Sequence, residues 1–329
     1  MKYSQSEKME IIRIVEQSSL SIRRTLEAIG VSRTSFYEWY HRYQEEGYEG
    51  LAPRQRKQHC FWNRIPKDQR DCVIQIAKQY PEKSCREVAW FITDYRGFYV
   101  SESSVYRILK EHDLIPAPVY AVVTAKEKFQ QPTQRVNELW QTGFTYLKVV
   151  HWGWYYLSTV MDDFSRYIIA WKLCSTMSAK DVKDTLDLAI QNTGVTNITV
   201  RHRPRLLSDN GPAYISKDLR QYLEEQGIDH TRGKPYHPMT QGKIERYHRS
   251  MKNLVLLDHY YSPGELEKRI EEWVKYYNER RYHEAIDNVT PKDKYSGCAA
   301  EIIEKREKVK RQTFRQRRCL NRSRVLLQL

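Results

Sequence analysis

The sequence predicts two small all-α units followed by an α/β domain built on a mixed sheet, and three observations support this prediction. Up to residue 113 the chain alternates amphipathic helical patterns with caps and turns. Residues 137–297 begin with β-rich runs and continue with alternating helix and strand patterns. Two stretches without periodicity, residues 51–66 and 114–136, separate these parts as linkers.

Residues 1–50 have the pattern of a helix-turn-helix DNA-binding domain. Ser4 and Glu7 have the spacing of a capping box at the start of the first helix. Gly30 supplies a turn, and Ser32 is placed to cap the helix that follows. An ordinary helical hairpin is the alternative. The first turns of the predicted recognition helix carry the candidate DNA-contacting residues Arg33, Thr34, Ser35 and Tyr37.

The helical patterns in residues 67–113 predict a second all-α unit, which resembles a helix-turn-helix domain. Three helical patterns follow one another, and Ser101 is the expected N-cap of the last, which carries Arg107 as a candidate DNA contact. The linker at 51–66 is basic. Two roles are open for it: contact with the phosphates of DNA, or a solvated spacer between the two units. Two small DNA-reading units in tandem suit a protein that recognises a long site.

For the α/β domain, the sequence pattern predicts a mixed five-stranded sheet with flanking helices. Three β-rich runs come first, and a tight turn at Trp152 and Gly153 joins the first two. If that turn has two residues, Gly143 lies opposite Asp162, with the two side chains about 5 Å apart on one face. An apolar strand ending before Asp209 and a strand near residue 230 follow, each next to helical patterns.

The C-terminal segment, residues 298–329, is strongly basic. From residue 301 it has ten Lys and Arg residues against three Glu residues. We consider two structures for it: a disordered basic tail, or an arm that holds nucleic acid.

The composition indicates a polyanionic partner. The net charge is +14 and the isoelectric point about 9.4, with the basic residues spread over several segments. Nucleic acid is the commonest such partner, and a merely basic soluble protein is the alternative. The six cysteines have neither C-x-x-C nor zinc-site spacing, which indicates a reducing compartment. No signal peptide or membrane span is visible, so we expect a cytoplasmic protein without a membrane partner.

Two acidic residues form the candidate catalytic constellation. Asp209 follows a short apolar strand, where ligands and metals collect in α/β sheets, although Asp-Asn-Gly is also an ordinary turn. Glu245 shares a helix face with Arg249 and Lys252, which by itself suggests a surface ion pair. The interval between the two acids, with 35 residues between them, is what favours a common site.

Residues 137–297 resemble the integrase core of retroviral integrases and bacterial insertion-sequence transposases, a ribonuclease H-like fold. The similar motifs follow in family order: WQTGFTYL, DDFSRYIIAW, SDNGPAY, GKIERYH with Lys252, and YYNERRYHEAIDNVTP. The zinc-binding head of retroviral integrases has no counterpart in the sequence. The resemblance therefore implies a bacterial mobile element, with the N-terminal units resembling those of insertion-sequence transposases.

The resemblance implies metal-dependent phosphoryl transfer on DNA. Three carboxylates hold two Mg²⁺ or Mn²⁺ ions in this family, because these hard cations take oxygen ligands and offset charge on the phosphate. Asp209 and Glu245 correspond to the second and third acids, and Gly143 occupies the position of the first. We expect this departure to impair catalysis, unless Asp162 enters the site instead. The residues implied to face DNA on the helix of Glu245 are Lys243, Arg249 and Lys252.

The predicted function is a DNA transposase or integrase of a bacterial insertion sequence. It is expected to bind element ends as double-stranded DNA, to act on target DNA, and to assemble as a homo-multimer, because two ends must be joined in concert. The expected location is the bacterial cytoplasm, associated with the nucleoid. The alternative is a non-catalytic DNA-binding protein derived from a transposase. A transcription regulator with a purely structural sheet domain does not account for Asp209, Glu245 and Lys252 together.

Overall fold

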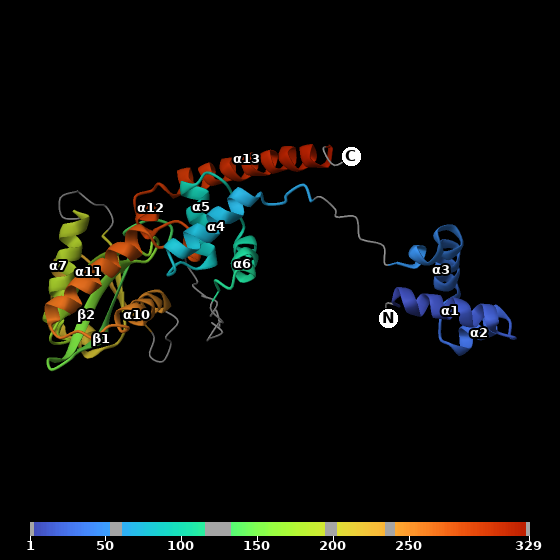
Figure 1. Ribbon diagram of the computed structural model, residues 1–329. Coiled ribbons are helices and arrows are strands. Elements are labelled where there is room, and N and C mark those ends of the chain that lie inside the picture. The colour runs from blue at the N-terminus through green and yellow to red at the C-terminus, as the bar shows by residue number, and fades with distance from the viewer. Residues whose placement is uncertain (1–2, 53–60, 116–132, 195–202, 234–240, 327–329) are drawn as a thin grey trace. The chain divides into compact units, whose positions relative to one another are not determined.

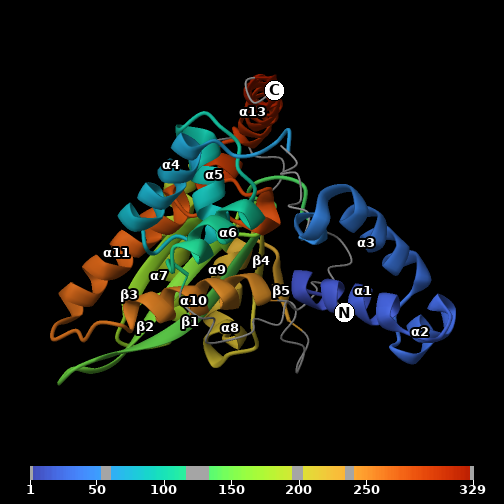
Figure 2. The ribbon, with the colours of Figure 1, turned by 45° about the vertical axis from the view of Figure 1, so that its right-hand side comes forward.

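A computed structural model of the protein describes residues 3–52, 61–115, 133–194, 203–233 and 241–326 (Figures 1 and 2). The chain forms two compact units, Met1–Phe61 and Trp62–Leu329. Most of both predicted linkers, at 51–66 and 114–136, lies outside the described residues. In the part of the chain that is described, no helix is both long enough and apolar enough to cross a membrane.

The first unit consists of helices α1 (Gln5–Gln17), α2 (Ile22–Ala28) and α3 (Arg33–Glu46) and the short 3₁₀ helix η1 (Gly47–Leu51). Ser4 and Glu7 form the predicted capping box. Gly30 has a φ of 70°, a left-handed conformation that glycine adopts without steric cost in the turn before α3. The core that holds the helices together contains Ile11, Ile12, Val15, Leu26, Val31, Phe36, Trp39 and Leu51. The predicted helix-turn-helix is thereby confirmed.

A second helical bundle opens the second unit, with α4 (Lys67–Gln79), α5 (Cys85–Tyr95) and α6 (Glu102–Glu111). Ser84 caps α5 in a capping box with Glu87, and the Ser101 side chain accepts a hydrogen bond at the start of α6, as predicted. Apolar residues spaced along one stripe of each helix form the core, namely Val73, Ile76, Val88, Ala89, Ile92, Val100, Val105, Ile108 and Leu109.

The five-stranded mixed sheet follows, as the sequence predicts. Its strands are β1 (Leu139–Val149), β2 (Gly153–Asp162), β3 (Ile168–Cys174), β4 (Arg205–Ser208) and β5 (His230–Arg232). The strand order is β3-β2-β1-β4-β5. The pairs β1–β2 and β2–β3 are antiparallel, whereas β4 is parallel to both β1 and β5. The architecture is therefore a mixed five-stranded sheet with flanking helices, preceded by all-α units, as the sequence predicts.

The turn between β1 and β2 differs from the prediction. Val149 pairs with Gly153, so the loop has three residues and is not a two-residue turn at Trp152 and Gly153. His151 in this loop has a φ of 65°, which closes the hairpin in a left-handed conformation. The register consequently shifts by three residues, and Gly143 pairs with Thr159 instead of Asp162.

Helices cover both faces of the sheet (Figure 1). On one face α7 (Ala179–Thr193), α8 (Pro212–Ile215) and α9 (Lys217–Glu225) pack over a core centred on Trp140, which is fully buried. The other face is covered by α10 (Gly242–Val255) and α11 (Pro263–Glu279). Since residues of a strand alternate between faces, the odd-numbered residues of β1, including Gly143, face α10.

The C-terminal segment is a helix, so the disordered alternative is wrong. After η3 (Glu284–Ile286) and α12 (Pro291–Tyr295), α13 runs from Ala299 to Leu326 and lies along the second helical bundle (Figure 1). Arg306 of α13 forms an ion pair with Asp94 of α5 at 2.7 Å, with 6% of the Arg306 side chain exposed. Tyr282 donates a hydrogen bond to the same carboxylate. The bundle, the end of the core and α13 are thus bound together.

The buried His283 makes this unit sensitive to acid. Burial, with smaller contributions from nearby arginines, lowers the pKa of His283 to about 3. The unfolded chain therefore binds a proton near pH 6.5 that the folded chain does not bind. As the pH falls from about 6.5 towards 3, each pH unit should cost about 1.4 kcal/mol of unfolding free energy from this residue.

The His283→Phe variant tests this prediction, because phenylalanine keeps a ring against Tyr277, whose centroid is 4.7 Å from that of His283. The free energy of unfolding is measured with denaturant at several pH values between 7 and about 4. Its slope against pH should be smaller in the variant than in the unmodified protein, by the amount that corresponds to one bound proton. Equal slopes for the two proteins would contradict the depressed pKa.

Candidate active site

The candidate site lies where β1, β4 and the start of α10 meet. Gln141 in β1 pairs with Leu207 in the parallel strand β4. Gly143 lies two residues beyond Gln141 in β1, and Asp209 comes directly after the end of β4 at Ser208. Glu245 lies in the first turn of α10. The three predicted catalytic positions thus lie on or directly after the three segments that meet here.

Gln241 joins the three segments directly. It immediately precedes α10, and its side-chain amide donates hydrogen bonds to the carbonyl oxygens of Thr142 in β1 (3.1 Å) and Leu207 in β4 (3.3 Å). The residue is 7% exposed, so these bonds form away from competing water. This one side chain therefore holds the start of α10 against both strands, four residues before Glu245.

A second buried contact holds the first turn of α10. The side-chain carbonyl oxygen of Gln141 accepts a hydrogen bond from the backbone N–H of Ile244 at 3.2 Å, and its amide donates to Asp163 at 2.6 Å. Lys243 forms an ion pair with the same Asp163 carboxylate at 2.6 Å, and Thr133 donates to it. The polar network that orients α10 thus consists of Gln141, Gln241, Asp163 and Lys243.

Sequence reasoning did not assign a role to Gln141, Gln241 or Asp163. Both glutamines and the aspartate lie within or beside the motifs WQTGFTYL, QGKIERYH and DDFSRYIIAW. The only signal in the sequence is therefore their place in these motifs, because no periodicity indicates which polar residues of a strand are buried.

Gly143 leaves room for a larger residue. A Cβ atom at this position would lie 3.7 Å from Cδ1 of Ile244 and 3.7 Å from Cε1 of His248, which are ordinary van der Waals distances. His248 is bonded to the Thr159 hydroxyl at 3.2 Å, and burial lowers the pKa of His248 to about 3. The position thus faces α10 beside a neutral imidazole, and no steric conflict requires glycine there.

Asp209 is held in a tight turn at the end of β4. Its Oδ1 accepts a hydrogen bond from the backbone N–H of Gly211 at 2.8 Å. A Cβ atom at Gly211 would lie only 2.9 Å from this oxygen, so glycine permits the close approach. The side chain of Asp209 is exposed. Its carboxylate is therefore oriented by the turn and accessible to a ligand.

Glu245, Arg249 and Lys252 follow one another on one face of α10, as the sequence predicts. Glu245 and Arg249 are exposed. The ammonium group of Lys252 lies 3.7 Å from the centre of the Tyr146 ring, and burial lowers its pKa below the ordinary value. This cation–π contact places one positive charge beside Tyr146 of β1.

Lys243, also predicted to contact DNA, is placed differently. Its side chain is only 11% exposed and is bonded to Asp163. The ammonium group thus holds α10 to the sheet, and its contact with DNA stays a prediction without support from this placement.

Asp162 does not enter the site. It pairs with Trp140, and its carboxylate accepts hydrogen bonds from the backbone N–H of Asn137 at 2.8 Å and of Ser165 at 2.8 Å. The hydroxyl of Ser165 donates to it as well, at 2.6 Å. Asp162 is fully buried and its burial raises its pKa. The hypothesis that Asp162 replaces the missing acid is wrong, because the three-residue turn moves it away from Gly143.

The residues present do not fit a pair of divalent cations. Such a pair needs bridging and terminal carboxylate oxygens, and Gly143 offers none. Among the described residues, no group of three or more His, Cys, Asp or Glu side chains could hold a metal ion. Of the three predicted ligand positions, Asp209 and Glu245 carry a carboxylate.

The predicted DNA-contacting residues of the helical units lie on helix surfaces. Arg33, Thr34 and Tyr37 are exposed in the first turns of α3, and Ser35 is half-buried there. Arg107 is exposed on α6, where its guanidinium donates to the carbonyl oxygen of Ser103 at 3.2 Å. These side chains are accessible to a duplex in each unit taken by itself.

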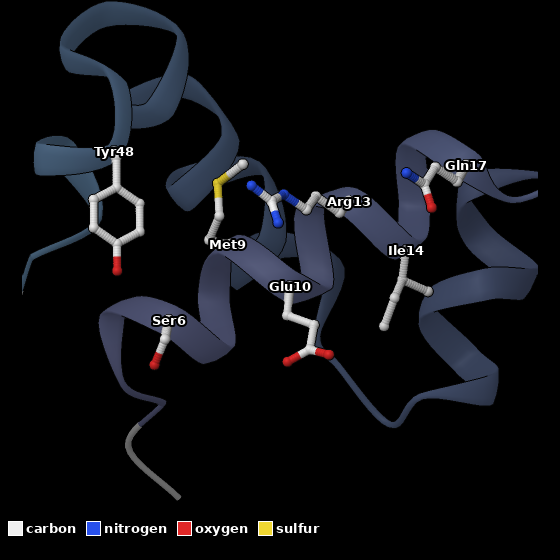
Figure 3. Close-up of a pocket in the computed structure, with 7 residues that line it drawn as sticks. All are labelled: Ser6, Met9, Glu10, Arg13, Ile14, Gln17 and Tyr48. Atoms are coloured by element: carbon white, nitrogen blue, oxygen red, sulfur yellow. The ribbon is translucent and has the colours of Figure 1, made fainter.

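A shallow groove also lies on the first unit (Figure 3). One face of α1, including Glu10 and Arg13, forms it together with Tyr48. The groove contains none of the predicted catalytic or DNA-contacting residues.

Family models match both the sheet domain and the helical units. Residues 133–238 and 226–291 each match an integrase core domain, and residues 2–52 and 35–109 each match a homeodomain-like domain. The integrase matches contain all three candidate catalytic positions. The homeodomain-like matches lie within the two helical units and the segment between them.

The curated relatives include transposases of bacterial mobile elements. The chain is 27% identical over 161 residues to the transposase for insertion sequence element IS904 of Lactococcus lactis, covering 48% of this chain and 60% of that protein. It is 24% identical over 273 residues to the transposase for transposon Tn552 of Staphylococcus aureus, covering 76% of this chain and 56% of that protein. The chain thus spans less than two thirds of the length of these relatives.

Among solved structures, the catalytic core domain of HTLV-2 integrase in complex with magnesium is similar over 49% of this chain and 97% of that chain. The sequence identity is 22% and the TM-score 0.39.

Proposed function

The chain belongs to the insertion-sequence transposases with an integrase-type catalytic core, and we propose that it binds the ends of a mobile DNA element through its helical units and is built for DNA strand cleavage and transfer. The observation that supports this proposal is that Gln241 joins the start of α10, the helix of Glu245, to β1, which carries Gly143, and to β4, which ends just before Asp209. The partners in this proposal are the terminal repeats and target DNA, with several copies of the chain bringing two ends together.

The proposal gives the side chains at the candidate site three roles: phosphate binding, orientation of α10, and supply of carboxylates. Arg249 and Lys252 bind terminal phosphates beside the site, since both lie on the face of α10 that carries Glu245. Gln241 and Gln141 are positioning residues that orient α10 through buried hydrogen bonds. Asp209 and Glu245 supply the two remaining carboxylates.

We further propose that strand transfer by this chain is impaired. Divalent metals, Mg²⁺ or Mn²⁺, serve integrase cores, and the absent carboxylate at position 143 leaves the site without its first ligand. A specific observation therefore favours a second candidate function: a DNA-binding protein, derived from a transposase, that occupies element ends without joining them.

The test is to measure binding and strand transfer in parallel, with duplexes that carry the terminal sequences of the element encoding the chain. We expect binding of these ends, with strand transfer near background in Mg²⁺ or Mn²⁺. Full activity of the unmodified protein would contradict our account of Gly143. Failure to bind any duplex would contradict both candidate functions.

The Arg33→Ala substitution tests the role of α3. Arg33 is exposed in the first turn of the predicted recognition helix, where a bidentate contact with a base contributes about 1–3 kcal/mol of discrimination. We expect affinity for the terminal sequence to fall by roughly tenfold to a hundredfold, with a smaller loss for random duplex. The Arg13→Ala variant on α1 is the matched control, because it removes an exposed arginine outside the recognition helix. Equal losses in both variants would exclude specific reading by Arg33.

A further inference from the structure

The C-terminal helix α13 buries a polar stripe against the second helical bundle. Its buried residues recur at intervals of seven, four and four positions, which places them on one side of the helix: Arg306, Thr313, Arg317 and Asn321. A stripe of this kind determines which side of α13 faces the protein and which side faces away.

Specific hydrogen bonds hold this orientation. Arg317 is 2% exposed, and its guanidinium donates to Oε1 of Gln69 in α4 (2.7 and 3.0 Å) and to the carbonyl oxygen of Tyr99 (2.7 Å). Arg306, about three turns earlier on the same side of α13, donates two hydrogen bonds of 2.7 Å to the carboxylate of Asp94. Because these bonds are buried and directional, α13 cannot rotate about its axis without losing them.

A second stripe on α13 is basic and exposed. Its members are separated by four, three and four positions and therefore share one face: Arg311, Arg315, Arg318 and Arg322. At about 100° per residue, this stripe is turned roughly 130° from the buried one. The stripe, called the arginine face below, extends along about 16 Å of helix.

Among the described residues, no carboxylate pairs with the arginine face, and Arg318 lies 5.0 Å from the centre of the Trp62 ring. From residue 308 to the end the sequence contains no Asp or Glu. Lys308 and Lys310 form ion pairs with Glu304 and Glu307, one turn earlier. Within the described residues, none of the four arginines has a carboxylate within ion-pair distance. Neighbouring like charges at these spacings destabilise a helix by a few tenths of a kcal/mol each, so a polyanion that binds them removes a repulsion.

We propose that the arginine face is a binding site for the phosphate backbone of duplex DNA. Guanidinium groups bind phosphate oxygens in bidentate geometry, and all four positions carry arginine rather than lysine. A duplex presents a phosphate about every 1.7 Å of its axis, so 16 Å of helix faces about ten charges. The site reads no sequence, and α13 holds it rigidly on the second helical bundle. This inference rests on the proposed action of the chain on DNA.

The experiment compares the full-length chain with a variant in which the four arginines of the arginine face are replaced by glutamine. Glutamine keeps a polar side chain with a similar helix propensity and removes the positive charge. Binding of a random-sequence duplex is measured by fluorescence anisotropy over a series of salt concentrations. Each lost phosphate contact should reduce the slope of log K against log salt by about 0.9, so a reduction of about three to four is expected. Affinity at low salt should fall at least about tenfold.

The matched control removes four exposed positive charges elsewhere in the second unit, from α7, α9 and α11, by the substitutions Lys180→Gln, Lys217→Gln, Arg220→Gln and Lys268→Gln. Its salt slope should change by less than about one. Equal changes in the two variants would overturn the inference, since net charge alone would then explain the loss.

Two further outcomes separate this inference from the proposed function. If the unmodified chain binds duplex and the four-arginine variant keeps its salt slope, the inference is overturned and the proposed function stands. If the unmodified chain binds no duplex, both are overturned. Phosphatidylserine vesicles serve as a second polyanion: binding them as tightly as duplex, with the same loss in the variant, would also overturn the assignment to DNA.

Discussion

Replacing Gly143 with aspartate is expected to raise Mg²⁺-dependent strand transfer by on the order of a thousandfold over the unmodified protein. Groups that hold charge in a preorganised site contribute about 10²–10³ in rate each. The new Cβ would meet Ile244 and His248 at 3.7 Å, which are ordinary van der Waals distances. Under the proposed function its carboxylate would act with Asp209, which follows β4, and with Glu245 in the first turn of α10. Strand transfer with terminal-sequence duplexes measures the gain.

Matched variants separate charge from shape at position 143. Gly143→Asn introduces a side chain of the same size without the carboxylate, and it should remain at background. Combining Gly143→Asp with Glu245→Gln should remove the gained activity, because a second ligand is then absent. If Gly143→Asp has no more activity than Gly143→Asn, position 143 is not the missing ligand.

Metal binding gives a readout that does not depend on DNA. A ligand present at a hundred times its Kd stabilises the folded protein by about 2.7 kcal/mol. For a domain of this size each kcal/mol raises Tm by about 2–4 °C. Added Mg²⁺ should therefore raise the Tm of the Gly143→Asp variant by several degrees, with a smaller effect on Gly143→Asn. Equal shifts in both would show that the third carboxylate does not complete a site.

The second large effect is expected at Asp163, whose replacement by alanine should lower the free energy of unfolding by about 3–5 kcal/mol. Asp163 is 1% exposed, and its carboxylate accepts hydrogen bonds from Lys243, Gln141 and Thr133. Removing it leaves the buried ammonium group of Lys243 without its carboxylate, and breaking a buried pair from one side is costly. Denaturant unfolding of the second unit measures the loss.

Two controls identify the cause of this loss. Glu304→Ala removes a partner of Lys308 from a pair in which both side chains are about 70% exposed, and its effect should stay within about 0.5 kcal/mol. Replacing Asp163 and Lys243 together with leucine and methionine should recover much of the stability, because neither charge then remains buried. An Asp163→Ala protein as stable as the unmodified one would contradict a structural role for the network.

Local sequence signals predicted most elements because their causes are local. The serine caps at Ser4 and Ser101 and the glycine turn at Gly30 depend on neighbouring residues only. The same holds for the alternation of apolar residues along a strand or a helix face. The spacing of Asp209 and Glu245 could likewise be recognised as a motif, which identified the candidate site before its geometry was known.

The hairpin between β1 and β2 shows where this reasoning fails. Trp152 and Gly153 permit a two-residue turn, but the pairing of Val149 with Gly153 produces a three-residue one. The shift moves Asp162 from the site into a buried turn. Register depends on which apolar residues of both strands reach the core together, and a short loop sequence does not specify this.

The sequence by itself determined the two helix-turn-helix units, the mixed sheet, the family motifs and the absence of the first acid at Gly143, because each is written in adjacent residues or in a fixed interval. Only the tertiary structure decided that Lys243 is buried against Asp163, that Gln241 joins β1, β4 and α10, and that the basic C-terminal segment is a helix docked on the second bundle. The physical reason is that these features arise from contacts between residues tens to hundreds of positions apart. In such contacts, polar groups that water solvates in the unfolded chain become buried and must find hydrogen-bond partners within the protein. No local pattern specifies which of these groups will meet.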